Sequence, residues 1–219
     1  MIPNLAVAAE TVAKVKATEW GISVVAEGVA WENSCRLKLI AREGKRKKEI
    51  SLKREETGCL LLGPAHLEVS ESTDHQTVTV FFEADRGDDS HNTGPIVEVF
   101  RLNESGIKKL GEQKIFDATY IRQNGQISSV TGKALFSLCP TCEYPVSLTP
   151  EENFFIPVKL TIGKGGIAVE STLSQQERKN LVAKFEAQAK AGAKENEEMK
   201  DYKEFISGIR HELRSLLKQ

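Results

Sequence analysis

The sharpest chemical pattern in the chain is a pair of cysteines in Cys139-Pro-Thr-Cys142. Two thiolates at this spacing can bind zinc or form a redox-active disulfide. A redox pair needs its first cysteine at a helix N-terminus, whereas the preceding run, 134–138, has the composition of a strand. A zinc site needs further ligands, which Cys35 and Cys59 supply only if the fold gathers all four thiols. The sequence favours structural disulfides, with inert thiols, zinc or redox chemistry as alternatives.

A second group of potential ligands lies in one loop between two strand-like runs. Its hard oxygen donors are Asp85, Asp88, Asp89 and Asn92. Calcium takes six to eight such oxygens, so the loop is a candidate cation site. The ligand spacing of the helix–loop–helix calcium motif is absent, and Arg86 adds a positive charge. A solvated turn is therefore the favoured interpretation, because aspartate, glycine and asparagine are typical turn residues.

The third feature is a basic segment made of Arg42, Lys45, Arg46, Lys47 and Lys48. Such a cluster can contact phosphates, anionic lipid or an acidic partner. Several glutamates are interleaved with it and weaken its field, so a hairpin tip kept in water by its charge is favoured. A net charge of −1 and an aromatic content of 6% argue against a dedicated nucleic-acid-binding protein.

Recognisable catalytic motifs are missing from the sequence. It contains no G-x-S-x-G nucleophile turn, no glycine-rich phosphate loop followed by Lys-Ser/Thr, and no H-E-x-x-H zinc motif. A hydrolase with carboxylates, such as Glu98 and Asp117 on different strands, or a histidine gathered in a cleft of the sheet is one alternative to a non-catalytic protein, and a zinc or redox module centred on the cysteines is another. Catalytic residues are therefore not assigned. No cofactor is expected, although zinc and calcium stay open at the two sites named above.

Most of the chain consists of short runs rich in β-branched and aromatic residues, separated by turn residues. The predicted strands are 22–26, 35–41, 49–52, 66–69, 76–82, 96–102, 114–121, 134–138, 155–162 and 167–170. No helical segment alternates with them, which argues against a parallel doubly wound sheet. The pattern predicts an antiparallel sandwich, barrel or propeller-like domain over 20–172.

The periodicity changes to helical after residue 172. Ser174-Gln-Gln-Glu177 has the sequence of a capping box, which starts a helix. Gly192 is predicted to interrupt that helix, and a second amphipathic helix follows. We call its apolar residues the C-terminal stripe: Met199, Tyr202, Phe205, Ile206, Ile209, Leu213, Leu216 and Leu217. This stripe must pack on the β domain, on the first helix or on another chain, which makes a homo-oligomer one possibility. The sequence thus predicts an α+β protein with a helical segment at 173–219.

The first nineteen residues form either an arm or a short helix, for which 8–18 has suitable composition. Ala6-Val7-Ala8 has the small-x-small form of a leader cleavage site, which slightly favours an extracytoplasmic location for a chain whose leader was trimmed. No apolar run approaches the roughly 20 residues that span a bilayer, so no membrane span is predicted. The leading functional hypothesis is a non-catalytic module that binds an unknown ligand or protein partner through its β domain.

Overall fold

The computed structural model describes residues 10–17, 19–27, 36–52, 65–85, 95–136 and 154–195. Within these ranges the chain forms three antiparallel sheets of four strands, each a meander of consecutive strands, followed by a helix. The first sheet contains β1 (Glu10–Lys16), β2 (Gly21–Glu27), β3 (Arg36–Glu43) and β4 (Arg46–Leu52). The second contains β5 (His66–Glu71), β6 (Val78–Asp85), β7 (Pro95–Asn103) and β8 (Gly106–Lys114). The third contains β9 (Phe116–Gln123), β10 (Gln126–Phe136), β11 (Phe154–Ile162) and β12 (Ile167–Ser171), and α1 (Gln175–Glu195) follows it.

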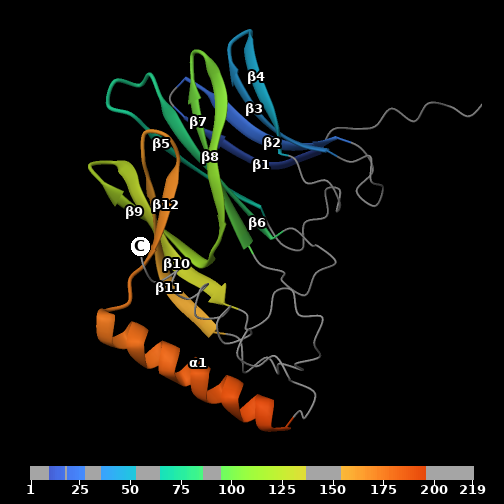
Figure 1. Cartoon of the computed structure of the whole chain (residues 1–219). Helices are drawn as coiled ribbons and strands as arrows, with labels where there is room; N and C mark the ends of the chain where they lie inside the picture. Colours follow the sequence, from blue (N-terminus) through green and yellow to red (C-terminus); the bar gives the residue numbers. More distant parts are fainter. Residues whose placement is uncertain are drawn as a thin grey trace, which may run out of the picture.

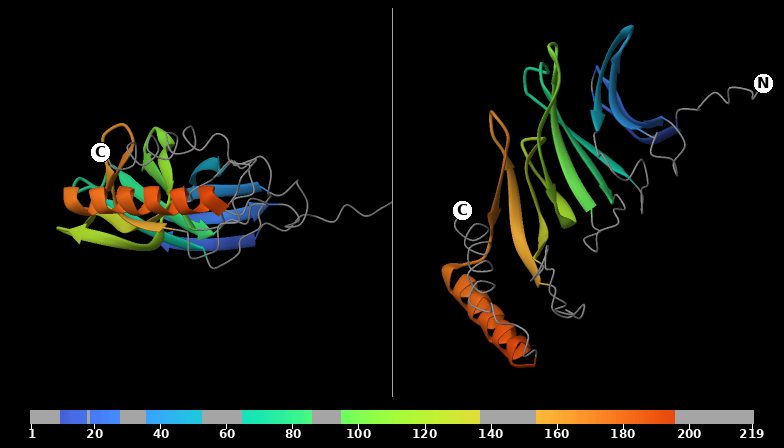
Figure 2. Two further views of the ribbon diagram at one scale, coloured as in Figure 1. Left: turned by 60° about the horizontal axis from the view of Figure 1, so that its bottom comes forward. Right: turned by 45° about the vertical axis from the view of Figure 1, so that its right-hand side comes forward.

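The three sheets are stacked face against face in chain order, with the second sheet in the middle (Figure 1). Helix α1 lies beyond the third sheet, on the side away from the second (Figure 2). One apolar core fills the space between the first and second sheets, and another fills the space between the second and third. Each described strand pairs only within its own sheet, so the described strands form a stack of three meander sheets rather than a closed barrel.

The middle sheet is buried on both faces, and its sequence shows why. On β6, Val80 and Phe82 face the first sheet, whereas Phe81 faces the third. A strand that is apolar on both faces reads as a continuous run instead of an alternation. The runs 78–82 and 96–100 approach this character, interrupted only by Thr79 and Glu98, and they supply three fully buried phenylalanines: Phe81, Phe82 and Phe100.

The predicted α+β class, antiparallel strands followed by a C-terminal helix, is confirmed. The capping box also forms, since Ser174 N donates to Glu177 Oε2 at 2.8 Å and Glu177 N donates to Ser174 Oγ at 3.3 Å. The Ser174 hydroxyl also donates to Glu177 Oε2 at 2.6 Å, and this bond, together with the one from Ser174 N, lowers the pKa of Glu177. Gly192 does not interrupt α1, which continues to Glu195. No helix in the described ranges is long and apolar enough to cross a membrane.

Four other elements differ from the prediction. β10 begins at Gln126, although the sequence pattern predicts a strand only from residue 134. Glu10–Lys16 form strand β1, paired with β2, where composition allows a short helix. The basic loop expected at 42–48 is a tight turn at Gly44 and Lys45, because β3 and β4 pair as far as Glu43 and Arg46. The run expected at 114–121 is divided at Ile115 between β8 and β9, and the rest of β8 is a strand that the sequence pattern does not predict.

Candidate functional site

The structure separates the five residues of the basic segment onto different surfaces. Register pairs Arg42 with Lys47 on the face of the first sheet that points away from the second. Lys45 occupies the β3–β4 turn. Lys48 points the other way and bridges to the second sheet, where its Nζ donates to the backbone oxygens of Asn103, at 2.8 Å, and Glu104. The segment is therefore not one patch.

A larger basic surface is formed by the outer face of the first sheet. The inner face is fixed by buried residues such as Ile22 and Leu39, which pack against the second sheet. Strand register then places the alternate residues of all four strands on the outer face. We call this surface the basic face, and its charged residues are Lys14, Lys16, Arg36, Lys38, Arg42, Lys47, Glu27 and Glu49. Six positive and two negative side chains give it a net charge of 6 − 2 = +4.

Both carboxylates of the basic face are already held by lysines. Glu27 Oε2 lies 2.6 Å from Lys38 Nζ, and Glu49 Oε2 lies 2.5 Å from Lys47 Nζ. The hydrogen bond to Glu27 raises the pKa of Lys38, and the hydrogen bond to Lys47 lowers the pKa of Glu49. The other four basic side chains are exposed and form no ion pair with any described residue; they are Lys14, Lys16, Arg36 and Arg42. These four side chains can bind an external anion without first breaking an ion pair.

A polar groove of about 540 Å³ lies where hairpin ends of the first and second sheets meet. Its lining includes four carboxylates, from Glu19, Glu43, Asp74 and Glu104, and one guanidinium, from Arg46 of the basic segment, whose Nη1 lies 3.6 Å from Glu43 Oε2. Trp20 also lines the groove, and Lys48 Nζ lies 5.6 Å from the centre of its ring. This hairpin-end groove thus has the opposite charge from the basic face.

Two of the polar side chains that line the hairpin-end groove, Asp74 and Asn103, are engaged in turns. Asp74 Oδ1 accepts hydrogen bonds from Ser72 Oγ at 2.5 Å and Gln76 N at 3.1 Å, which lower the pKa of Asp74. Asn103 Oδ1 similarly accepts from Ser105 N and Gly106 N. Among the described residues, no three histidine, cysteine, aspartate or glutamate side chains are grouped to hold a metal ion. The groove therefore carries no metal assignment.

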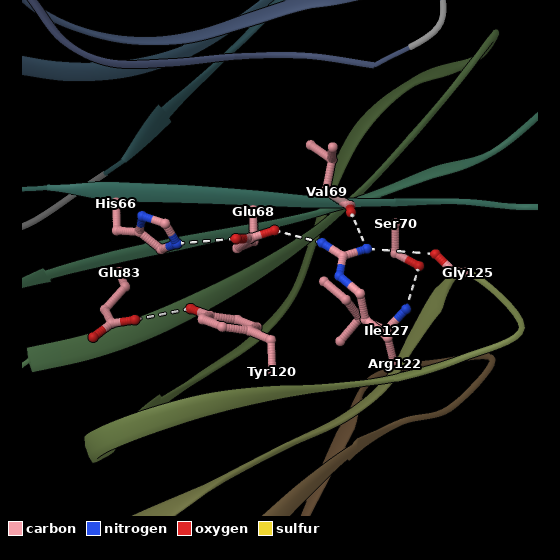
Figure 3. Close-up of polar contacts among 9 residues, drawn as sticks. All are labelled: His66, Glu68, Val69, Ser70, Glu83, Tyr120, Arg122, Gly125 and Ile127. Atoms are coloured by element: carbon pink, nitrogen blue, oxygen red, sulfur yellow. Dashed lines mark hydrogen bonds and ion pairs between the residues drawn. The ribbon is translucent and has the colours of Figure 1, made fainter.

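Polar residues also connect the second and third sheets (Figure 3). Tyr120 Oη donates to Glu83 Oε2 at 2.9 Å, and Arg122 Nη2 donates to Glu68 Oε2 at 2.6 Å. Glu68 Oε1 is 3.2 Å from His66 Nε2. Burial raises the pKa of Tyr120, and the neighbouring Glu83 carboxylate raises it further. A phenol held in its protonated form is suited to a fixed hydrogen bond rather than to acid–base turnover near neutral pH.

Tyr120 is expected to make the protein less stable in alkali. The tyrosine pKa is near 10 in the unfolded chain and higher in the folded chain, so above about pH 10 the unfolded state loses a proton that the folded state retains. The free energy of unfolding should therefore fall as pH rises through this range. Urea unfolding between pH 8 and about pH 11 measures it, with Tyr120→Phe as the comparison. In Tyr120→Phe the free energy of unfolding should fall less steeply with pH than in the parent. Parallel pH profiles for the two proteins would contradict a raised pKa of Tyr120 in the folded chain.

The carboxylates considered for a hydrolase do not meet. Glu98 is fully buried on the side of β7 that faces the first sheet, and its Oε1 lies 2.6 Å from Lys109 Nζ. Asp117 is exposed on β9 and pairs with Lys133 at 2.8 Å. Lys109 Nζ also lies 2.5 Å from Glu112 Oε2, so the lysine is shared by two carboxylates on neighbouring strands. This cluster is arranged as an ion-pair network across β7 and β8.

Several candidates from the sequence lie outside the described residues. These are Cys35, Cys59, Cys139, Cys142, Asp88, Asp89, Asn92 and the C-terminal stripe. Asp85 is described, at the end of β6, and its Oδ1 is buried with no hydrogen-bond partner among the described residues. The structure therefore leaves the cysteine and calcium hypotheses as predictions.

Sequence reasoning found only two residues of the basic face, Arg42 and Lys47, because the others are separated along the chain. The sequence does contain an alternating pattern of basic residues. Positions 14 and 16 are both basic, and so are three of the four alternate positions 36, 38, 40 and 42. In a strand, this spacing puts them on one face. Recognising the face also required β1 to be recognised as a strand.

Comparison with known proteins assigns neither a family nor a function to these surfaces. No protein-family model matches the chain, and no curated protein does. No solved structure matches the fold. The functional argument therefore depends on the geometry and charge of the surfaces described above.

Proposed function

We propose that the protein is a non-catalytic binding module whose basic face binds a short acidic segment of a protein partner. The observation that carries this proposal is the gathering of six basic side chains on one face of a four-stranded sheet, four of them without an ion pair to a described residue. Binding of this kind requires no cofactor. It depends on charge complementarity, which steers encounter and fixes the register of the complex.

The spacing of the basic side chains supports an extended acidic segment. Alternate residues of a strand are separated by about 6.6 Å, because each residue advances the chain by about 3.3 Å. Lys14 and Lys16 on β1, and Arg36 and Lys38 on β3, have this spacing. Alternate carboxylates of an extended acidic peptide repeat at the same distance. Such a peptide can therefore place successive charges opposite successive lysines or arginines.

The charge of the rest of the chain favours a small ligand over a long polyanion. The whole chain has a net charge of −1, so everything outside the basic face carries −1 − 4 = −5. A membrane or a long nucleic acid would extend beyond the face and be repelled by this excess. The face also carries no aromatic side chain among its described residues, so it offers no platform for stacking bases.

The test measures binding of a fluorescently labelled oligoglutamate peptide to the full chain at low and moderate salt. In the variant Lys14→Glu/Lys16→Glu the charge of the basic face falls from +4 to 0. We expect an affinity loss of about tenfold or more, which corresponds to about 1.4 kcal/mol. The matched control is Lys164→Glu/Lys179→Glu, which alters two exposed lysines far from the face and has the same total charge. The control should bind within about twofold of the parent, because Coulomb interactions are screened beyond the Debye length.

Three results would contradict the proposal. Equal losses in both double variants would show a dependence on total charge rather than on the basic face. Tighter binding of phosphatidylserine vesicles or of an oligothymidine strand than of the peptide would point to a membrane or a nucleic acid instead. No saturable binding of the peptide at low salt would remove the acidic-segment proposal altogether.

A further inference from the structure

Within the basic face, a lane of short side chains runs along β2, between β1 and β3. Its floor consists of Gly21, Ser23 and Val25, which alternate with inward-facing residues of β2 and therefore point outward. Gly21 has no side chain and Val25 is only 9% exposed, so the floor lies below the ends of the long basic side chains beside it. None of the three floor residues is charged. We call this strip the β2 lane.

Basic side chains border the β2 lane on both sides. On β1, Lys16 lies opposite Gly21, and Lys14 is the next outward residue. On β3, Arg42 lies opposite Gly21, and Lys38 stands farther along the same side. Neighbouring strands are about 4.8 Å apart, so the Cα atoms of Lys16 and Arg42 are separated by roughly 10 Å with the glycine between them. Of these four basic residues, only Lys38 forms an ion pair with a described residue.

Among the described residues, nothing requires a glycine at position 21. A Cβ atom on Gly21 would meet only the backbone oxygen of Arg42, at 3.8 Å, which is an ordinary van der Waals contact. The φ angle of Gly21 is outside the left-handed region. Glycine weakens a strand, because it loses more backbone entropy on folding and packs no side chain, and it often marks a place where a ligand approaches closely. The missing side chain therefore indicates a ligand on the floor between Lys16 and Arg42.

We propose that the acidic segment of the partner lies along the β2 lane and that the sequence recognised is a run of about four consecutive acidic residues. This inference rests on the proposed function and specifies its ligand. Successive side chains of an extended segment point to opposite sides, so one carboxylate reaches β1 and the next reaches β3. From Gly21 to Val25 the lane is about 13 Å long at 3.3 Å per residue, which accommodates such a run.

The acidic run is supplied by a different protein rather than by a second copy of this chain. The sequence nowhere contains more than two consecutive acidic residues. Two copies that met through their basic faces would also place lysines and arginines against each other, and like charges repel. The β2 lane is therefore matched to a partner with a more acidic segment than this chain contains.

The first test fills the β2 lane without changing its charge. In Gly21→Val and in Ser23→Val the added side chain occupies the floor. We expect the affinity of the full chain for the labelled oligoglutamate peptide to fall about tenfold or more in each variant. The matched control Ser51→Val adds a similar side chain to the same face on the edge strand β4, outside the lane, and should bind within about twofold of the parent. Urea unfolding identifies any variant that does not fold, in which case the other lane variant decides.

The second test compares two labelled peptides of equal charge. One contains four consecutive glutamates, and the other contains four glutamates that alternate with serines. Alternation places every carboxylate on the same side of an extended chain. The peptide with consecutive glutamates should bind about fivefold or more tighter, because its carboxylates reach both sides of the lane.

The outcomes separate this inference from the proposed function. Weaker binding in the two lane variants but not in Ser51→Val, with tighter binding of the consecutive peptide, supports the inference. Unchanged binding in a folded lane variant, equal losses in all three variants, or equal affinity for the two peptides would overturn it. If Lys14→Glu/Lys16→Glu still weakened binding in that case, the proposed function would stand without the lane. If the parent bound neither peptide, both proposals would fall.

Discussion

Phe81→Ala or Phe82→Ala is expected to lower the free energy of unfolding by about 3–5 kcal/mol. Both side chains are fully buried in the middle sheet, Phe81 against the third sheet and Phe82 against the first. Alanine leaves a cavity in each case and removes the favourable transfer of a large ring from water. Because domains of this kind are stable by only about 5–15 kcal/mol, either change removes a large share of the total. Urea unfolding followed by circular dichroism measures both losses.

The two variants also test whether the stack unfolds as one unit. Since β6 contributes to both cores, a loss on either face should shift a single transition of the whole stack. The control is Lys45→Ala in the exposed β3–β4 turn, which should change stability by less than about 0.5 kcal/mol. Losses below about 1 kcal/mol for both phenylalanines would contradict the assigned burial. Separate transitions, with only one shifted in each variant, would show that the two cores are independent.

Much of the fold could be predicted because its central strands are strongly apolar. β6 and β7 are recognisable from local sequence, since β-branched and aromatic residues dominate the runs 78–82 and 96–100, where Thr79 and Glu98 are the only polar residues. β8 was missed because Lys108, Lys109, Glu112 and Lys114 make it resemble a charged loop. Its pairing with β7 and the ion pair of Lys109 with buried Glu98 stabilise it as a strand, and neither is visible in local composition.

The candidate site was less predictable because it is defined by register. Arg42 and Lys47 were recognised as basic, but Lys48, next in sequence, faces the opposite side and binds the second sheet. A one-residue change in register exchanges the two faces of a strand, so sequence neighbours are poor guides to surface neighbours. Lys14 and Lys16 join the face only because β1 pairs with β2, a contact that follows from the fold and not from the local pattern.

Gly132→Ala is expected to destabilise the protein by about 1–3 kcal/mol, because the sheet has no room for a methyl group there. A Cβ atom at this position would lie 2.3 Å from Ile115 Cγ2 and 2.7 Å from the backbone oxygen of Phe116. Ile115 is fully buried where the chain passes from the second sheet to the third. Phe116 pairs with Lys133, so moving its carbonyl would disturb β9 and β10. Thermal and urea unfolding of the variant measure the cost.

Gly111 provides a matched comparison, because its close neighbours are all atoms of one side chain. A Cβ atom on Gly111 would lie 2.6 Å from Ile167 Cγ1 and 2.8 Å from its Cδ1. In an Ile167→Ala background, Gly111→Ala should therefore lose most of its cost. In an Ile115→Ala background, Gly132→Ala should keep much of its cost, since the Phe116 oxygen stays in place. Double-mutant cycles resolve this difference if the coupling energies exceed about 0.5 kcal/mol. If removal of the neighbouring isoleucine reduced the stability cost equally at both glycines, the backbone around Gly132 would be able to move away from the added methyl group. Crowding by side chains alone would then exclude a larger residue where the second and third sheets join.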